Sequence, residues 1–131
     1  MSKINIKIPA SISIDKWFTE KQKRKWMLTV NNGSVTVSVT FGNKKFLTLI
    51  DAMEYITHKV NLGWCLEQTP IDKSDCKITL GRVTDKNYAK EFPDQEYWFQ
   101  VTDQVDTVCI NLSEETFRDV KKHLSTTYFR D

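Results

Sequence analysis

Apolar and polar residues alternate with a period of two in several segments, which is typical of strands that bury one face. In the first third of the chain the apolar positions of these segments are Ile4, Ile6 and Ile8, then Ile12 and Ile14, then Trp26, Leu28 and Val30, and then Val35, Val37, Val39 and Phe41. Residues 31–34 (Asn-Asn-Gly-Ser) separate the last two segments. Because Asn and Gly tolerate the positive φ of tight turns, we predict a β-hairpin here.

A helical repeat follows these strands. Its apolar positions, spaced by three and four residues, are Leu49, Ala52, Met53, Ile56 and Val60. A Gly-Asn pair at positions 42 and 43 suggests a turn before it, and Thr48 is a suitable N-cap with Asp51 three residues later. Gly63 is a suitable helix terminator. The first half of the chain is therefore predicted to form strands and then one helix that begins at Thr48.

The second half repeats this order. Its strand-like segments are residues 64–66, 76–80, 97–101 and 108–112, and residues 84–95 are expected to form a long loop. Residues 103–106 (Asp-Gln-Val-Asp) suit a turn. Ser113 is expected to cap a second helix, whose N-terminal dipole favours Glu114 and Glu115. The buried stripe of that helix is predicted to be Phe117, Val120, Leu124 and Tyr128, with Leu112 and Phe117 spaced as a hydrophobic staple.

Together the two halves predict an α+β fold, an antiparallel sheet with two helices in one domain of 131 residues. Residues 1–63 and residues 64–131 each carry strands and then a helix. A duplicated strand-strand-strand-strand-helix unit is therefore one interpretation. The two halves do not align residue by residue, so the sequence leaves the duplication open.

The composition favours a folded cytoplasmic chain, with ordinary hydrophobic (40%) and charged (27%) contents. No segment has the roughly 20 apolar residues of a membrane span, and the N-terminus lacks the apolar core of a signal peptide. We therefore expect a cytoplasmic protein without membrane contacts. Its cysteines, Cys65, Cys76 and Cys109, are expected to be reduced and buried.

The net charge of +2 hides an asymmetry along the chain. Residues 1–60 contain ten Lys/Arg and four Asp/Glu, a net +6, and residues 61–131 contain nine and thirteen, a net −4. Folding can turn this asymmetry into one basic and one acidic face, or it can intermix the charges. The sequence leaves both arrangements open.

The strongest candidate site is the stretch of residues 16–26, which contains five basic and three aromatic residues. Cations neutralise phosphates and aromatic rings stack on bases, so single-stranded nucleic-acid binders need both. The candidate contact residues are Lys16, Trp17, Lys21, Lys23, Arg24, Lys25 and Trp26, with Lys44 and Lys45 extending the surface. The alternatives are a solvated basic loop with Trp26 and either Trp17 or Phe18 in the core, and a protein-binding patch.

Two further observations concern aromatic residues and enzyme chemistry. Trp98, in an aromatic strand, could pair with Trp64 as a stacking pair, a dimer contact or part of a second core. His58 and His123 are the only imidazoles, and no third group is placed to orient His58 with Cys65. The chain has neither CxxC zinc spacing nor a glycine-rich phosphate loop. We therefore expect no catalytic residue, no metal and no cofactor.

Residues 106–124 resemble the end of a positive-cofactor-type coactivator domain, in which a last strand runs into a Leu-[Ser/Thr/Asn]-x-Glu-x-[Phe/Trp] helix start. Here that start is Leu-Ser-Glu-Glu-Thr-Phe at residues 112–117, and an aromatic strand precedes it at residues 97–99. The doubled order of elements is similar to the Whirly and Pur-type folds. The resemblance implies a curved antiparallel sheet that binds single-stranded DNA or RNA, in a dimer or larger assembly. Asp and Thr at positions 103, 106 and 107 replace the family's glycine- and lysine-rich approach to the last strand, which argues against nucleic-acid contacts in that hairpin.

From these patterns we expect a non-enzymatic protein that binds single-stranded DNA or RNA with a basic, aromatic-bearing sheet face. A homodimer is compatible with this function, because an unpaired strand edge tends to be covered or paired. The alternative is a small protein-binding inhibitor or adaptor, such as one encoded by a phage or mobile element, which the charge asymmetry favours. An enzyme of unknown type is a third hypothesis that no residue pattern supports.

Overall fold

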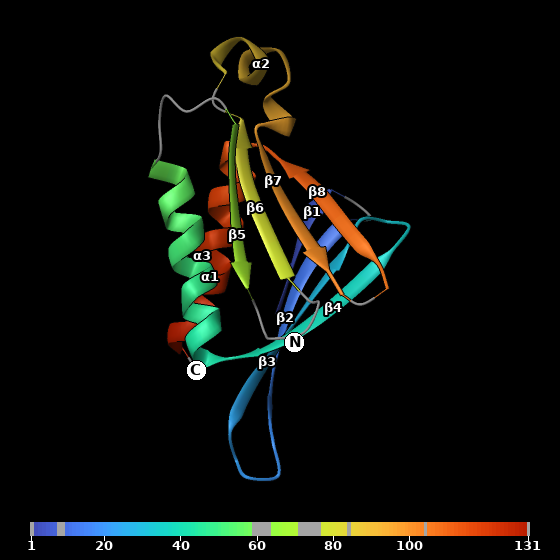
Figure 1. The fold of residues 1–131 in the computed structure, drawn as a ribbon, viewed down its shortest axis with the longest axis vertical. Helices are drawn as coiled ribbons and strands as arrows, with labels where there is room; N and C mark the ends of the chain where they lie inside the picture. The colour runs from blue at the N-terminus through green and yellow to red at the C-terminus, as the bar shows by residue number, and fades with distance from the viewer. Residues whose placement is uncertain are drawn as a thin grey trace.

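The computed structural model describes residues 2–7, 10–58, 64–70, 77–83, 85–103 and 105–130, with the backbone alone for residues 2–7, 17, 58 and 64–70. Two antiparallel sheets lie against each other, and two long helices pack beside them (Figure 1). The described elements are β1 (Ser2–Lys7), β2 (Ala10–Phe18), β3 (Arg24–Asn31), β4 (Thr36–Gly42), α1 (Asn43–His58), β5 (Trp64–Pro70), β6 (Lys77–Val83), α2 (Lys86–Glu91), the 3₁₀ turn η1 (Pro93–Gln95), β7 (Tyr97–Thr102), β8 (Thr107–Leu112) and α3 (Glu114–Arg130).

Each sheet is a four-stranded antiparallel meander, in the order β1-β2-β3-β4 and β5-β6-β7-β8. Helix α1 follows the first sheet and helix α3 follows the second, so each half runs through four strands and then a long helix. This confirms the predicted α+β class. The chain forms two sheets rather than one because each half pairs its own strands in sequence order.

The period-two pattern is confirmed in the hairpin of β3 and β4. Trp26, Leu28 and Val30 are buried, and Val37, Val39 and Phe41 are buried opposite them. The intervening Thr and Ser residues of β4 are exposed on the other face. The predicted turn is held by side chains, since Asn31 Oδ1 accepts from Gly33 N at 2.6 Å and Asn32 Oδ1 accepts from Val35 N at 2.9 Å. Gly33 adopts a φ of 99°, a backbone conformation that would be strained for a residue with a side chain.

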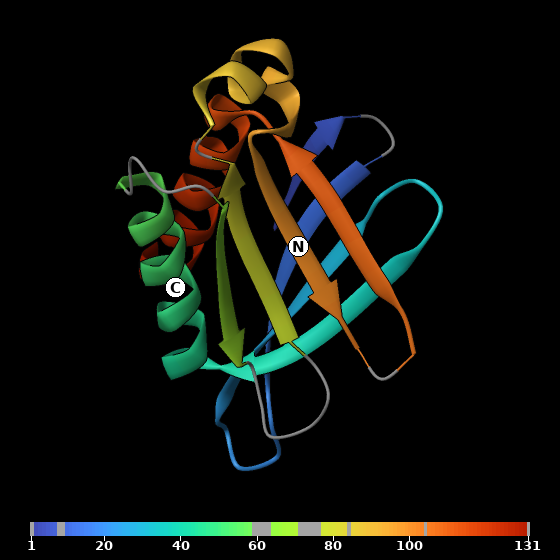
Figure 2. The same ribbon diagram turned by 45° about the horizontal axis from the view of Figure 1, so that its top comes forward.

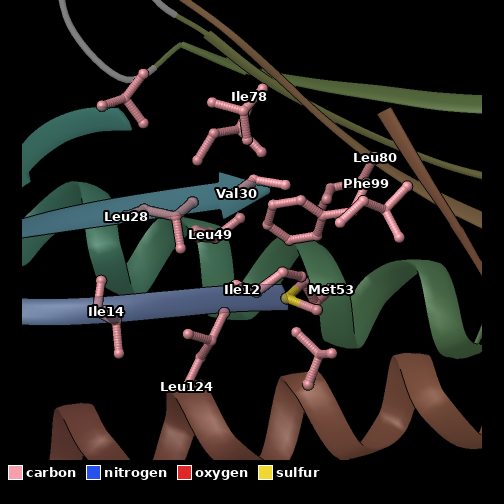
Figure 3. Close-up of a cluster of buried hydrophobic side chains, with 14 of the residues drawn as sticks. Ile12, Ile14, Leu28, Val30, Leu49, Met53, Ile78, Leu80, Phe99 and Leu124 are labelled. Carbon is pink, nitrogen blue, oxygen red and sulfur yellow. The ribbon is translucent and has the colours of Figure 1, made fainter. Parts of the chain in front are cut away.

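One hydrophobic core draws on both halves (Figure 3). Helix α1 contacts β3 and β4 of the first sheet, β5 and β6 of the second, and α3. The buried side chains of this core, from β2, β3, β6, β7 and the two long helices, include Ile12, Ile14, Leu28, Val30, Leu49, Met53, Ile78, Leu80, Phe99 and Leu124. The apolar faces of both sheets and both long helices are therefore removed from water together, which is the usual way for such layers to be stabilised.

The predicted start of the first helix at Thr48 is wrong, because α1 begins at Asn43, immediately after β4. The buried stripe extends one turn further back, to Phe46, than the repeat that begins at Leu49. Thr48 is not a cap, since its hydroxyl donates to the carbonyl oxygen of Lys44 at 2.9 Å within the helix. At the first residue of α1, the Asn43 side chain accepts hydrogen bonds from Arg24 Nε and Trp26 Nε1 of β3.

The long loop predicted at residues 84–95 is also wrong. Helix α2 and the turn η1 occupy it, and the carboxylate of Asp85 caps α2 by accepting from Asn87 N at 2.9 Å and Tyr88 N at 3.1 Å. Because α2 and η1 contain no buried residue, the segment has no apolar stripe from which a helix could be predicted.

The predicted start of α3 is confirmed. Ser113 Oγ accepts from Thr116 N at 3.2 Å, and Leu112 and Phe117 are both buried, as the hydrophobic staple requires. Val120 and Leu124 continue the buried stripe. The predicted turn between β7 and β8 is confirmed as well, since Asp103 N donates to Asp106 O at 3.0 Å.

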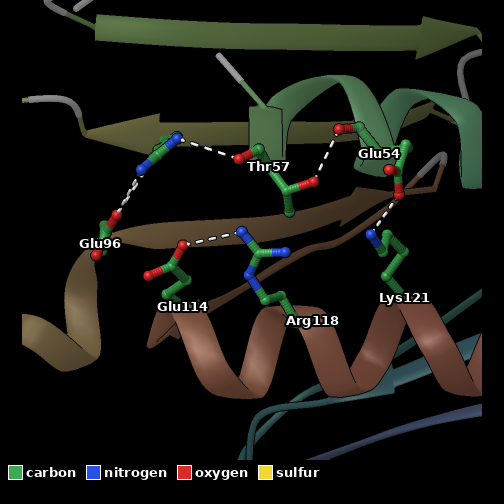
Figure 4. A network of polar contacts seen from close by, with 7 residues as sticks. Glu54, Thr57, Glu96, Glu114, Arg118 and Lys121 are labelled. Carbon is green, nitrogen blue, oxygen red and sulfur yellow. Dashed lines mark hydrogen bonds and ion pairs between the residues drawn. The ribbon is translucent and has the colours of Figure 1, made fainter. Parts of the chain in front are cut away.

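Polar contacts tie the helices to each other and to the second sheet (Figure 4). Lys121 of α3 forms an ion pair with Glu54 of α1. Arg82 of β6 forms an ion pair with Glu96 at 3.2 Å, and both side chains are largely buried. Arg82 also donates to the carbonyl oxygen of Thr57 at 3.5 Å, at the end of α1. These contacts join α1 both to α3 and to the strands that follow it.

Candidate nucleic-acid interface

The distal part of the β2–β3 hairpin, residues 16–25, forms an arm that extends beyond the body of the molecule (Figures 1 and 2). The backbone of the arm closes in a tight loop, in which Thr19 N donates to Lys23 O at 2.9 Å and Gln22 N donates to Thr19 O at 2.8 Å. Gln22 has a φ of 61°. This pattern is the three-residue hairpin loop with one left-handed residue. The connection between the strands therefore has a defined structure.

Three of the predicted contact residues lie exposed on the arm. Lys16 is on β2, and Lys21 and Lys23 are in the loop. The Lys16 ammonium lies 5.9 Å from the ring centroid of Phe18, which is itself 54% exposed. Glu20 is exposed in the same loop, so the arm carries one carboxylate among its cations. The side chain of Trp17, another predicted contact, lies outside the described residues.

At the base of the arm, Arg24 contacts both the start of α1 and the end of α3. Its Nε donates to Asn43 Oδ1 at 2.9 Å, and its guanidinium lies 5.1 Å from the Trp26 ring centroid and 5.7 Å from the Tyr128 ring centroid. The positions of Arg24 and Asn43 relative to each other are set by strand pairing, since Lys25 pairs with Gly42. Arg24 therefore contributes positive charge from a partly buried, fixed position.

Trp26 is a predicted contact that the structure corrects. Its side chain is completely buried, its Nε1 donates to Asn43 Oδ1 at 2.7 Å, and its ring packs edge-on against Phe46 at 4.8 Å. A ring with no exposed face cannot stack on a base. The alternative interpretation, in which Trp26 belongs to the core, is the correct one for this residue.

The structure brings the remaining predicted cations to the base of the arm. Lys25 lies opposite Gly42, the last residue of β4. Lys44 is exposed and Lys45 is half-buried, and both lie in the first turn of α1 directly after that strand. Cations from positions 24–25 and 44–45 are thus neighbours because β3 and β4 pair.

The end of α3 is also part of this surface, which the sequence pattern did not predict. Tyr128 lies beside Arg24, its ring centroid is 5.0 Å from that of Phe129, and both Phe129 and Arg130 are exposed. The helical stripe in the sequence marked Tyr128 as buried but carried no signal that it would meet the arm. We call this surface the basic end. Its cations are Lys16, Lys21, Lys23, Arg24, Lys25, Lys44, Lys45 and Arg130.

Trp98 lies on the outer face of the second sheet, over Gly81. A Cβ on Gly81 would stand 1.8 Å from Cζ2 of the Trp98 ring, so the ring occupies the space that a side chain would need. The two residues pair directly across β6 and β7. Trp98 therefore packs on its own sheet, and the side chain of Trp64, its suggested partner, lies outside the described residues.

Two other groups in the second sheet have unusual environments. The Tyr97 hydroxyl is buried without a hydrogen-bond partner among the described residues, and this burial raises the pKa of Tyr97 to about 12. Cys109 was expected to be buried but is exposed on β8, and it is a free thiol. Cys76 and the side chain of Cys65 lie outside the described residues.

Within the described ranges, no three His, Cys, Asp or Glu side chains lie together as a metal site would require. No described helix is long and apolar enough to cross a membrane. Comparisons with protein-family models, curated proteins and solved structures find no match to this chain. The geometry of the basic end is therefore the feature of this chain that bears most directly on its function.

Proposed function

We propose that this chain is a non-enzymatic protein that binds single-stranded nucleic acid through its basic end. The observation that carries the proposal is the meeting of eight described Lys and Arg residues from three separate segments, residues 16–25, residues 44–45 and Arg130. A polyphosphate backbone is the ligand that such a surface attracts most strongly, because each neutralised phosphate releases bound counterions.

The start of α1 adds to the same positive potential. The first turn of this 16-residue helix contains no acidic residue, and it carries Lys44 and Lys45. Unpaired backbone N–H groups and the helix dipole make a helix N-terminus favourable for an anion. The dipole and the side-chain charges therefore act in the same direction.

A single strand fits the basic end better than a duplex does. Phe18 and Phe129 are 54% and 70% exposed, and both accompany the cations. Aromatic rings contribute to binding by stacking on bases, and only unpaired bases offer a free face. The outward faces of β3, β4, β7 and β8, by contrast, carry mainly Ser, Thr, Asn and Gln, and Trp98 is the one aromatic side chain on them.

The proposal is tested by fluorescence anisotropy with a labelled oligo(dT) of about 30 nucleotides, long enough for several contacts. We expect saturable binding at low salt that weakens steeply as salt rises, tighter than binding to a duplex of equal length. An oligo(U) of the same length shows whether RNA serves equally well. Binding that does not respond to salt would contradict the proposal.

A matched pair of double variants locates the surface. We expect Lys21→Ala/Lys23→Ala to weaken binding and to lower the slope of log affinity against log salt by about 1.4, since each single-strand phosphate contact contributes about 0.7. The control is Lys86→Ala/Lys90→Ala, which removes two exposed lysines from α2 at the opposite end of the molecule (Figures 1 and 2). Equal losses in both variants would show that binding is not located at the basic end.

No binding of either nucleic acid at low salt would overturn the proposal. An acidic protein surface would then be the partner that the basic end complements, in the manner of the inhibitor or adaptor hypothesis.

A further inference from the structure

The strand register decides which side chains share a side of the arm. Lys16, Phe18 and Arg24 have the same parity along β2 and β3 as the buried Ile12, Ile14, Trp26 and Leu28. Since successive side chains of a strand point to opposite faces, these three residues lie on the continuation of the core-facing side. We call it the inner side of the arm.

The inner side of the arm faces the end of α3. Phe18 pairs with Arg24 across the hairpin, and the Arg24 guanidinium reaches the Tyr128 ring. The Tyr128 ring in turn meets the Phe129 ring at 5.0 Å, with the two ring planes at 89°. Phe18 therefore lies directly across the hairpin from Arg24, and Phe129 lies one ring further away, beside Tyr128.

The fold itself gives no reason for these two rings to stay in water. Large hydrophobic residues are usually buried, and the described side chains include only five that are exposed: Phe18, Tyr55, Phe92, Val105 and Phe129. The two at the basic end lie among cations, with Lys16 5.9 Å from the Phe18 ring centroid and Arg130 next to Phe129 in the chain. Exposed rings beside cations are the combination by which proteins hold unpaired bases.

We propose that Phe18 and Phe129 stack on the bases of a single strand that crosses the basic end, while the lysines contact its phosphates. This inference rests on the proposed function and gives Phe18 and Phe129 a specific role there, as the groups that contact the bases. It assigns two separable effects: the rings set affinity through the bases, and the lysines set the dependence on salt.

The experiment compares Phe18→Ala, Phe129→Ala and the control Phe92→Ala, which removes an exposed ring beside α2 at the opposite end. We expect each of the first two changes to weaken oligo(dT) binding by about 5- to 100-fold, the range for loss of one base–aromatic stack. The salt slope stays unchanged, because no phosphate contact is lost. Phe92→Ala binds like the wild type.

An abasic oligonucleotide of the same length separates stacking from other effects. We expect the wild type to bind it more weakly than oligo(dT), and the two variants to bind it as the wild type does. Phe18→Leu and Phe129→Leu, which keep an apolar side chain without an aromatic face, are expected to behave like the alanine variants. Circular dichroism spectra that match the wild type show that the folds are intact.

Two results would overturn the inference. One is affinity of Phe18→Ala and Phe129→Ala for oligo(dT) equal to that of Phe92→Ala. The other is an equal loss on the abasic strand. If the wild type still binds both strands in a salt-dependent way, only the stacking role fails and the proposed function stands. If the wild type binds neither strand, the proposed function fails as well.

Discussion

The two halves of the chain differ clearly in the connection between their second and third strands. In the first half this connection is the arm, where residues 16–25 contain five basic residues and one acidic residue. In the second half it is residues 84–96, which include α2 and η1 and contain four acidic and two basic residues. The two connections lie at opposite ends of the molecule (Figures 1 and 2).

This difference shows how one order of elements yields two different ends. The strands and long helices of both halves supply the common core, and the second-to-third connection is free to vary because it lies outside that core. The charge asymmetry along the sequence becomes a separation in space at these two connections. We therefore propose the first connection as the binding site and use the second as the internal control.

The largest expected difference is in the free energy of unfolding when Trp26 of β3 and Tyr97 of β7 are changed. Each is the first aromatic residue of the third strand of its half. Trp26→Ala should lower the free energy of unfolding by about 3–5 kcal/mol, because a fully buried ring would leave a cavity. Tyr97→Phe should change it by less than about 1 kcal/mol, since the buried hydroxyl has no partner among the described residues. Urea denaturation of both variants measures the difference. A large loss for Tyr97→Phe would reveal a hydrogen bond to the Tyr97 hydroxyl.

A smaller difference in stability is expected between alanine substitutions at two strand glycines, Gly81 and Gly42. Gly81→Ala should destabilise the protein by about 1–3 kcal/mol, because the new methyl group would overlap the Trp98 ring. Gly42→Ala should stay within about 0.5 kcal/mol of the wild type, since its methyl group would lie 3.7 Å from Lys25 Nζ, an ordinary contact. Thermal unfolding measures the two changes in stability, and the NMR signal of the Trp98 indole N–H reports the environment of its ring. An unchanged Trp98 environment in Gly81→Ala would contradict the packing described for this pair.

The smallest expected effect concerns pH and the turns between the third and fourth strands. Asp103 Oδ1 accepts from Val105 N at 2.7 Å and Asp106 N at 2.8 Å, and these bonds hold the pKa of Asp103 below its ordinary value. A lowered pKa in the folded state means that the turn is stabilised above the ordinary carboxyl pKa and loses this support as pH falls through the folded value.

The equivalent turn of the first half is the control for this effect. It is held by the amide side chains of Asn31 and Asn32, which do not titrate. In an acid titration followed by NMR, the amide signals of Val105 and Asp106 should shift with Asp103, while that of Ser34 should stay in place. Joint movement of all three signals would indicate general unfolding instead.

Sequence reasoning succeeded where the contacts are local. The start of α3 depends on Ser113 and on Thr116 three residues later, and the β3–β4 turn depends on Asn and Gly within four residues. The start of α1 could not be predicted in the same way. Its first residue, Asn43, accepts hydrogen bonds from Arg24 and Trp26, and no local pattern shows that these residues lie beside it.

For the candidate site, the basic stretch was evident from its composition, but the availability of its aromatic residues was not. Trp26 and Phe18 have the same parity along the hairpin, yet one is completely buried and the other is 54% exposed. The difference arises because Trp26 lies under Phe46 and Tyr128. Distance along the arm from the helices, which the sequence does not encode locally, decides which ring is covered.

The sequence by itself determined the α+β class, the strand-then-helix order of each half, and the concentration of cations near residues 16–25 and 44–45. These features follow from periodicity, caps and composition, which act over a few residues. Only the tertiary structure decided that Trp26 is unavailable and that Phe129 and Arg130 join Phe18 at one end. The physical reason is that burial depends on how the sheets and helices pack together, and that packing brings the last turn of the chain beside an arm formed near its beginning.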